Sequence, residues 1–398
     1  MFSLSTQNDS NRGLSIHYLI LITVIVAAGL SQGLLLPVLS IFLEQMGVSS
    51  SVNGLNAAAL YVGSFAMTLV AERTLGALGF KKLVSAGLVL VLVSVILFPL
   101  VPSVKVWFVL RLLVGIGDSA VHYAAQLWVL MVTPAEYRGR NLSLYGMSYG
   151  LGFSFGPLGI QLLKYGNAVP FIVLALLMLL VLVLVWAKLP DFRPERTEGE
   201  AQPPRRFRRS YALAWYALLP ALLYGYMEAG INSNFPVYGL RTGMGESQIA
   251  FLLPFIGIGG LILQLPLGML SDRFGRKNVL IACGLIGGAA FMAVPLAGTA
   301  TAWLVLLLCL AGGMVGSFFS LGLAYAADIL PKALLPAANV VASFHFNIGS
   351  IAGPNIGGIL MQYGWNGGVF VVMGLAFALF GAVGTAFRTS GGRSQEPL

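Results

Sequence analysis

Of the 398 residues, 58% are hydrophobic and only 9% are charged, and the mean hydropathy is +0.87. Soluble domains carry about 25% charged residues, so this composition excludes a protein whose whole surface faces water. The net charge of +9 comes from basic residues in short loops, which is typical of membrane topology and not of a nucleic-acid-binding face. Cys283 and Cys309 lie inside apolar segments, so we expect neither a disulfide framework nor a metal site.

The apolar runs are long and continuous, which favours membrane-spanning helices over a β-barrel. A bilayer core needs about 20 apolar residues per helix. Twelve segments satisfy this length, and the first is too long for a signal peptide. In chain order they are 16–43, 52–72, 82–101, 105–131, 139–163, 168–188, 210–236, 247–270, 278–298, 301–328, 334–361 and 366–387.

Residues 189–209 are charged, contain proline and lack hydrophobic periodicity. We expect them to form a cytoplasmic linker between an N-terminal six-helix bundle (1–188) and a C-terminal one (210–398). With both termini in the cytoplasm, nineteen of the twenty-three Lys and Arg residues lie on the cytoplasmic side. The sequence therefore predicts a multi-pass protein of the cell membrane, surrounded by lipid.

The two halves resemble each other at an offset of 196–198 residues. Segment 107–110 (WFVL) matches 303–306 (WLVL), Pro134 matches Pro331, and Gly156-Pro157 matches Gly353-Pro354. Parallel six-helix repeats are a known way to build a transporter, with a substrate path between the halves.

Asp118 and Glu228 are the only acidic residues well inside apolar segments. A charge at the bilayer centre costs roughly 2.5–3.5 kcal/mol even on the lenient insertion scale, so each needs a partner or water. Asp118 and His122 are four residues apart and can touch, whereas Arg111 lies two turns away and needs another partner.

The Asp118–His122 pair is either a structural hydrogen bond or a proton site. We favour the proton site, because its protonation would respond to rearrangement of its surroundings. At an offset of 196, the second half has Met314 and Phe318 instead, so the pair is not needed to build the repeat.

Other polar residues follow helical spacing and predict cavity-lining stripes. The predicted substrate-cavity residues are Gln32, Gln126, Tyr224, Asn232, Asn339, Ser343 and Asn347. The predicted proton-coupling residues are Asp118, Glu228, Arg111 and His122.

Residues 268–277 read GMLSDRFGRK, which resembles the loop signature G-x-L-x-D-R-x-G-R-K/R of the major facilitator superfamily. The resemblance implies an all-α membrane protein with twelve helices in two pseudo-symmetric bundles. The corresponding loop of the first half, VAERTLGALGFKK, is a degenerate version.

From this loop we expect Gly268 to allow a close helix approach and Asp272 to sit at a helix N-terminus. By pseudo-symmetry the loop would latch onto residues 138–141 and stabilise an outward-open state. A simple topology anchor is the alternative. The predicted conformational residues are Gly268, Asp272, Arg273, Gly275, Arg276, Gly156, Pro157, Gly353 and Pro354.

Two further motifs resemble subgroups of that superfamily. Residues 111–117 (RLLVGIG) are similar to the R-x-x-x-G-x-G pattern of proton-coupled members, and the Gly-Pro pairs resemble the signature of twelve-helix drug:proton antiporters. Several of those antiporters carry an acid on the first helix, where this chain has Gln32. In the family's fold, the helix that bears Arg111 and Asp118 lines the central cavity.

These observations predict a monomeric secondary transporter that works by alternating access and uses a proton gradient and no cofactor. We expect efflux of amphipathic, drug-like small molecules. The alternatives are a sugar or metabolite carrier, a flippase for a lipid-linked substrate and a transport-inactive receptor. An enzyme is not expected, because the sequence shows no nucleophile–base constellation.

Overall fold

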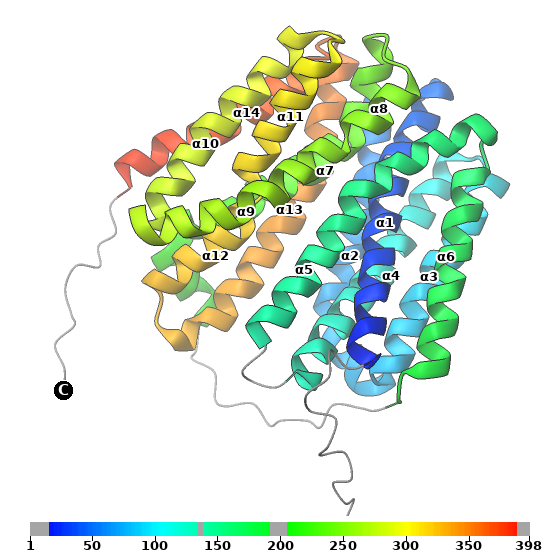
Figure 1. Ribbon diagram of the computed structural model, residues 1–398, viewed down its shortest axis with the longest axis horizontal. Coiled ribbons are helices and arrows are strands. Elements are labelled where there is room, and N and C mark those ends of the chain that lie inside the picture. Colours follow the sequence, from blue (N-terminus) through cyan, green and yellow to red (C-terminus); the bar gives the residue numbers. More distant parts are fainter. Residues whose placement is uncertain (1–15, 134–137, 192–204, 388–398) are drawn as a thin grey trace, which may run out of the picture.

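The computed structural model describes residues 16–133, 138–191 and 205–387, and within these ranges the chain is helical without a β-strand (Figure 1). The first half contains α1 (Ile16–Gln45), α2 (Ser50–Leu78), α3 (Phe80–Leu100), α4 (Val104–Val132), α5 (Arg138–Phe155), its 3-10 continuation η2 (Gly156–Tyr165) and α6 (Val169–Lys188). The second contains α7 (Arg206–Arg241), α8 (Glu246–Leu252), α9 (Pro254–Phe274), α10 (Arg276–Ala293), η3 (Val294–Ala297), α11 (Thr301–Val315), α12 (Phe318–Ile329), η4 (Lys332–Leu334), α13 (Leu335–Gln362) and α14 (Gly368–Ala386).

Each of the twelve predicted spans is largely helical, although the ends differ and some spans contain two helical elements. The helix α7 begins at Arg206, inside the predicted linker, and 192–204 lie outside the described residues. Two spans are interrupted: α9 starts with Pro254, which needs no hydrogen bond for its nitrogen at that position, and Gly316-Ser317 separate α11 from α12.

Among the described residues, nine segments are long and apolar enough to cross a bilayer by themselves. The fully described helix α7 is not in this group. Helix α4 contains Arg111, Asp118 and His122, and α7 contains Glu228. These ionisable residues are thus concentrated in two helices, which have to be covered by the others.

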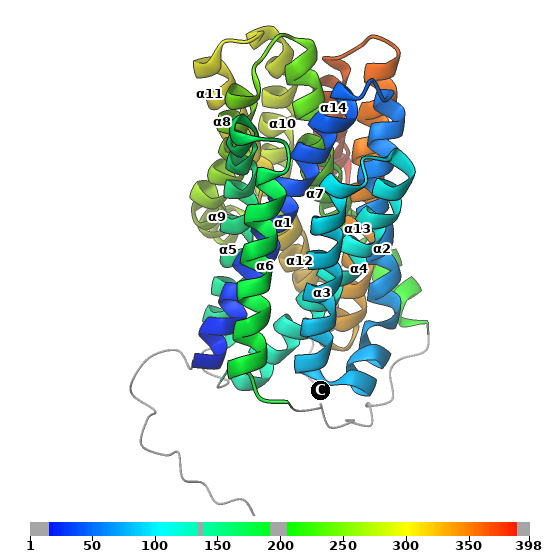
Figure 2. The same ribbon diagram turned by 90° about the vertical axis from the view of Figure 1, so that its right-hand side faces the viewer.

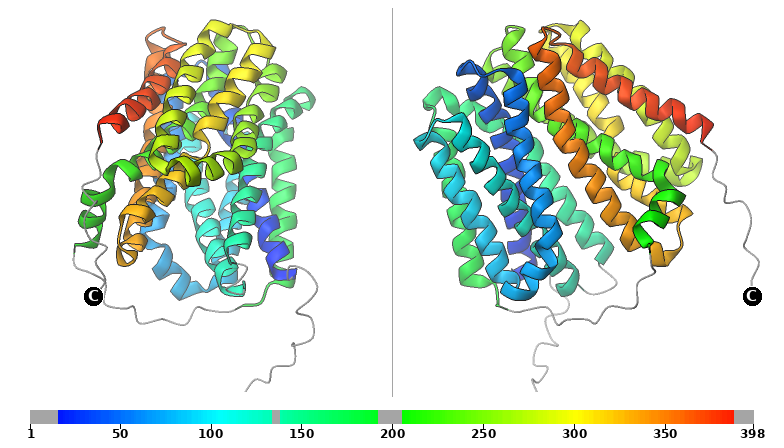
Figure 3. Two further views of the ribbon diagram at one scale, coloured as in Figure 1. Left: turned by 60° about the vertical axis from the view of Figure 1, so that its left-hand side comes forward. Right: turned by 180° about the vertical axis from the view of Figure 1, so that it is seen from behind.

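The two halves lie side by side and diverge towards the end where α6 ends and α7 begins, here called the linker end (Figures 1 and 3). Figure 2 shows α3 and α6 on the flank of the first half that faces away from the second.

At the opposite end the halves are joined by polar contacts. Arg241 of α7 donates two hydrogen bonds to the Glu44 carboxylate of α1, at 2.6 and 3.1 Å, and Gln45 donates to Glu246 at 2.7 Å. The described residues therefore show a molecule that is closed at the end away from the linker.

Glycines let helices of the same half approach closely, and they do so at matching places in the two halves. A Cβ atom on Gly115 of α4 would overlap the carbonyl oxygen of Leu60 in α2, and one on Gly312 of α11 would overlap that of Ile256 in α9. The reverse contacts match as well: Gly63 meets Leu112, and Gly259 meets Cys309. Small residues at such crossings are the usual basis of helix packing in membranes.

These contacts show that equivalent residues of α4 and α11 are 197 positions apart in the sequence. This offset corrects part of the sequence alignment. Trp107 is 3% exposed and its structural counterpart is the buried Leu304, whereas Trp303 is 61% exposed. The similarity between WFVL and WLVL was therefore one residue out of register. By the same register, the counterparts of Asp118 and His122 are Val315 and Phe319, and not Met314 and Phe318.

Turns between helices repeat in the same way. Gly79 (φ 82°) and Gly275 (φ 86°) both have the positive φ that favours glycine, and they occupy matching places between α2 and α3 and between α9 and α10. The loop of the first half has lost most of the charged motif but keeps this turn.

We predict that Gly312→Val lowers the free energy of unfolding by about 1–3 kcal/mol, because the added side chain has to displace the backbone of α9. The measurement is the thermal denaturation midpoint of the purified protein. Gly76→Val is the matched control, since a Cβ there has no neighbour within 4 Å. Equal midpoints for the two variants would contradict the packing role of Gly312.

Candidate functional site

Asp118 of α4 is 4% exposed and accepts a hydrogen bond from a neutral side chain of another helix. The side-chain amide of Gln32 in α1 donates to Asp118 Oδ2. The Tyr149 hydroxyl of α5 in turn donates to Gln32 Oε1 at 2.9 Å. A chain of hydrogen bonds thus connects α5, α1 and α4 inside the first half.

His122 lies one turn along α4 from Asp118. Its Nε2 is 3.8 Å from Asp118 Oδ2, and its Nδ1 is 3.3 Å from the hydroxyl of Tyr145 in α5. The ring packs edge-on against Tyr149, with centroids 4.6 Å apart. The His122 side chain is 27% exposed, so it connects the buried carboxyl group of Asp118 to the surface of the protein.

Glu228 of α7 is the buried acid of the second half, with 8% of its surface exposed. The Tyr224 hydroxyl donates to Glu228 Oε1 at 3.4 Å, and the Asn232 amide donates to the backbone oxygen of Glu228 at 2.8 Å. The predicted stripe of Tyr224, Glu228 and Asn232 is therefore present on α7, although the amide of Asn232 binds its own helix.

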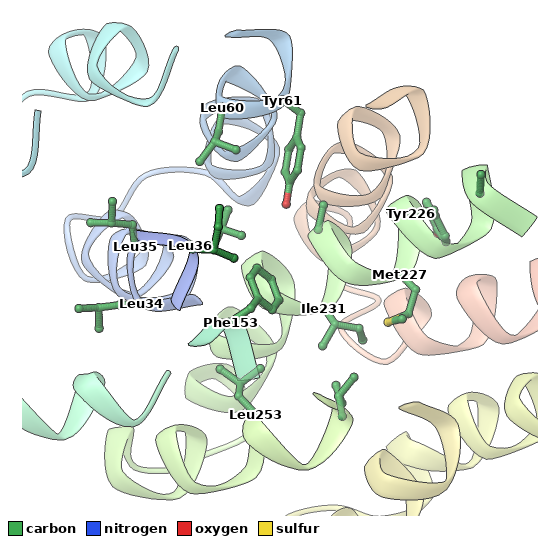
Figure 4. Close-up of a cluster of buried hydrophobic side chains, with 14 of the residues drawn as sticks. Leu34, Leu35, Leu36, Leu60, Tyr61, Phe153, Tyr226, Met227, Ile231 and Leu253 are labelled. Atoms are coloured by element: carbon green, nitrogen blue, oxygen red, sulfur yellow. The ribbon is translucent and has the colours of Figure 1, made fainter. Parts of the chain in front are cut away.

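Tyr61 of α2 and Tyr149 of α5 lie near both acids. Each interacts electrostatically with both Asp118 and Glu228, and Tyr61 also interacts with Arg111. In Figure 4 the Tyr61 hydroxyl points into the region where Leu36 and Phe153 of the first half approach Ile231 of α7. We call the following residues the central cluster: Gln32, Tyr61, Arg111, Asp118, His122, Tyr145, Tyr149, Tyr224 and Glu228.

The tyrosines Tyr61, Tyr145 and Tyr149 are missing from the sequence-based prediction. Tyr145 and Tyr149 could have been found, because they share a helical face with Gly152 and Gly156 at i, i+4, i+7 and i+11. Tyr61 has no comparable signal, since a lone tyrosine in an apolar helix is as typical of core packing.

Several predicted cavity residues have no hydrogen bond to the central cluster among the residues described. Gln126 and Asn339 are exposed. Ser343 donates to the backbone of Asn339, and Asn347 donates to the backbone of Ser343. Their side chains thus pair within their own helix, and their role in a cavity stays a prediction.

The loop motif after α9 forms contacts within its own half. Arg276 Nε is 2.9 Å from Asp328 Oδ2 of α12, and the guanidinium is 3.6 Å from Asp272 Oδ1. The Asp272 side chain is 72% exposed, and a Cβ on Gly268 would have no neighbour within 4 Å. The expected close approach at Gly268 was therefore wrong for this conformation, and the role of Asp272 at a helix N-terminus stays a prediction.

The loop motif was expected to contact residues 138–141, but most of the side chains in this segment lie outside the described residues. The Gly-Pro pairs do have a visible role, because Gly156 packs on the backbone of Gly33 and Gly353 on that of Tyr226. Each pair therefore marks a close helix crossing.

Comparison with known proteins gives a consistent result. The sequence profile described as Major Facilitator Superfamily matches residues 21–263 and 221–397. The chain is 42% identical over 351 residues to the uncharacterized MFS-type transporter YfkF of Bacillus subtilis, covering 87% of this chain and 89% of that protein. It is 24% identical over 371 residues to Multidrug resistance protein 2 of the same species, with coverage of 87% and 88%.

Two solved structures share the fold. The nucleoside transporter NupG superposes with a TM-score of 0.75 at 13% identity, over 94% of this chain and 99% of that one. A bacterial homolog of the human lysosomal transporter Spinster, in an inward-facing and occupied conformation, gives a TM-score of 0.69 at 16% identity, over 94% and 96%.

We predict that Gln32→Leu lowers the free energy of unfolding by about 1–3 kcal/mol, because the buried Asp118 carboxyl group loses its hydrogen-bond donor. In an Asp118→Leu background the same change should cost much less. A double-mutant cycle on thermal midpoints measures the difference, with the exposed Gln126→Leu as control. Additive effects of the two changes would rule out the coupling.

Proposed function

This chain belongs to the major facilitator superfamily, and on that premise we propose that it exports amphipathic organic molecules in exchange for protons. It is a multi-pass membrane protein with the fold of a secondary transporter. We further propose that it works as a monomer in the cell membrane, with the linker end in the cytoplasm. The positive charges of the short loops support this orientation.

The observation that carries the proton-coupling proposal is a pair of buried acids, one in each half. Asp118 pairs with the Gln32 amide and Glu228 with the Tyr224 hydroxyl, so both have neutral hydrogen-bond partners. A carboxylate buried without a cation is costly, and protonation removes the charge. A change of access that brings water or a cationic substrate to these groups therefore favours release of the proton.

His122 supplies a route for that proton. It is partly exposed, 3.8 Å from Asp118 and close to the Tyr145 hydroxyl. Imidazole exchanges protons near neutral pH, so His122 is placed to pass a proton between solvent and the carboxyl group.

Aromatic rings around the central cluster support an amphipathic substrate. Tyr224 lies 6.0 Å from Phe346 and 6.5 Å from Phe319, and Phe65 and Phe344 meet across the two halves at 5.3 Å. Such rings bind apolar and cationic groups. The similarity to Multidrug resistance protein 2 supports the same substrate class.

A metabolite carrier is the second candidate. Gln32, Tyr149 and Tyr224 place hydrogen-bonding groups together near the boundary between the halves, and these groups suit a polyhydroxylated substrate. The fold it shares with the nucleoside transporter NupG is compatible with this alternative.

The proton-coupling proposal predicts that Asp118→Asn together with Glu228→Gln abolishes substrate-driven proton movement, because neither amide exchanges a proton. The assay uses proteoliposomes that contain a pH-sensitive dye, with ethidium as the amphipathic probe and uridine as the metabolite probe. Asp191→Asn, an exposed acid on the surface, is the matched control. Proton movement that survives the double change would refute the assigned roles, and a response to uridine alone would favour the metabolite carrier.

Alternating access predicts that the Glu44–Arg241 pair stabilises closure at the end away from the linker, which we call the outer end. Such exposed pairs contribute about 0.2–1 kcal/mol, so Glu44→Gln should increase outside accessibility by up to roughly fivefold. The measurement is external maleimide labelling of Ile231→Cys, a buried position between the halves, after replacement of Cys283 and Cys309. The charge-reversed pair Glu44→Arg with Arg241→Glu should restore the original rate. If neither change affects labelling, this ion pair does not control the outer end.

A further inference from the structure

Arg111 is the most deeply buried charge in the described part of the chain that no contact explains. Its side chain is 1% exposed, and none of its three guanidinium nitrogens has a hydrogen-bond partner among the described residues. Buried polar groups are almost always hydrogen-bonded, and an isolated buried charge is especially costly. The guanidinium therefore requires an acceptor that the described side chains do not provide.

The two buried acids do not fill this role here. The Asp118 carboxylate accepts from Gln32, Glu228 accepts from Tyr224, and neither forms an ion pair with Arg111. The nearby acids are thus engaged by neutral donors while the cation remains without an acceptor.

Tyr61 supplies a second hydrogen-bond donor for a candidate anion-binding site. Its hydroxyl is buried, also lacks a hydrogen-bond partner among the described residues, and interacts electrostatically with Arg111. The close contact of Gly115 with Leu60 locks α2 against α4 and so holds Tyr61 and Arg111 in fixed relation. A guanidinium and a phenolic hydroxyl, both able to donate, are therefore held together by the scaffold.

The site also connects to the boundary between the halves. Tyr61 interacts electrostatically with Glu228 of the second half, and its hydroxyl points towards the meeting of Leu36, Phe153 and Ile231 (Figure 4). An anionic group bound by Arg111 and Tyr61 would thus belong to a molecule that also reaches the acids.

We infer that the transported molecule is an amphipathic zwitterion whose anionic group is bound by Arg111 and Tyr61. This rests on the proposed function, in which a cationic group of the substrate replaces the protons of Asp118 and Glu228. Arginine binds carboxylates through paired hydrogen bonds, and the tyrosine hydroxyl supplies a further donor. A substrate with one carboxylate and one ammonium group complements both the unpaired cation and the two acids.

The test compares three fluorescent probes with the same dansyl group and similar linkers, bound to the purified full-length protein. Dansylcadaverine is a cation, 6-(dansylamino)hexanoate is an anion, and Nε-dansyl-lysine is a zwitterion. We expect the zwitterion to bind roughly tenfold more tightly than the cation, since a charge-assisted hydrogen bond to arginine is added. Absence of binding by the zwitterion, or equal affinity of zwitterion and cation, would overturn the inference.

Variants assign the preference to the two residues. Arg111→Met should remove the advantage of the zwitterion over the cation, Arg111→Lys should keep part of it, and Tyr61→Phe should reduce it. The ratio of affinities within one preparation is insensitive to partial unfolding. If Arg111→Met weakens cation and zwitterion equally, Arg111 pairs with an internal acid in another conformation and the inference fails.

A measurement of proton release distinguishes a failure of this inference from a failure of the proposed function. Release of protons on binding of dansylcadaverine, lost in the Asp118→Asn and Glu228→Gln double variant, supports proton exchange whatever the role of Arg111. A zwitterion preference without proton release would retain the anion site and reject the exchange.

Discussion

A polar side chain in the interior of this bundle has to find its partner inside the protein, because the surrounding hydrocarbon offers none. The arrangement of the first half follows from this constraint. Asp118 is supported by Gln32, Gln32 by Tyr149, and His122 by Tyr145, so that α1, α4 and α5 are tied together by side chains. Interactions of this kind are specific in geometry as well as favourable, and they set which helices lie next to each other.

Close packing at glycines supplies the second ordering principle, and it is common to both halves. The crossings at Gly115 and Gly312 have the same geometry although the residues around the acids differ, with Val315 and Phe319 in the places of Asp118 and His122. The duplicated scaffold is therefore independent of the chemistry that each half carries. Among the described residues, the first half carries a polar network around Asp118, and the second carries one buried acid, Glu228, next to the aromatic ring of Tyr224.

Much of the fold could be predicted from the sequence, because each membrane helix satisfies its own backbone and its apolar length is directly visible. Helical spacing also grouped Asp118 with His122 and Tyr224 with Glu228 correctly. It could not show that Gln32 binds Asp118, since that contact joins residues 86 positions apart. The alignment of Trp107 with Trp303 was wrong because short apolar motifs recur by chance, whereas glycine crossings identify true equivalents. Gly268 shows a different error. The motif predicted a close helix approach at this glycine, but a Cβ there would have no neighbour within 4 Å in this conformation.

The ionisable side chains of α4 have a consequence for how the protein is made. A helix with Arg111, Asp118 and His122 partitions poorly into lipid alone, because an arginine or an aspartate costs about 2.5–3.5 kcal/mol at the bilayer centre unless it has a partner. Helices α1, α2 and α3 precede α4 in synthesis and are apolar enough to insert first. They provide Gln32 and Tyr61 before α4 arrives, whereas Tyr145 and Tyr149 follow later. Membrane insertion of α4 is therefore coupled to its docking on helices already in place, and the order of the helices along the chain serves biogenesis as well as transport.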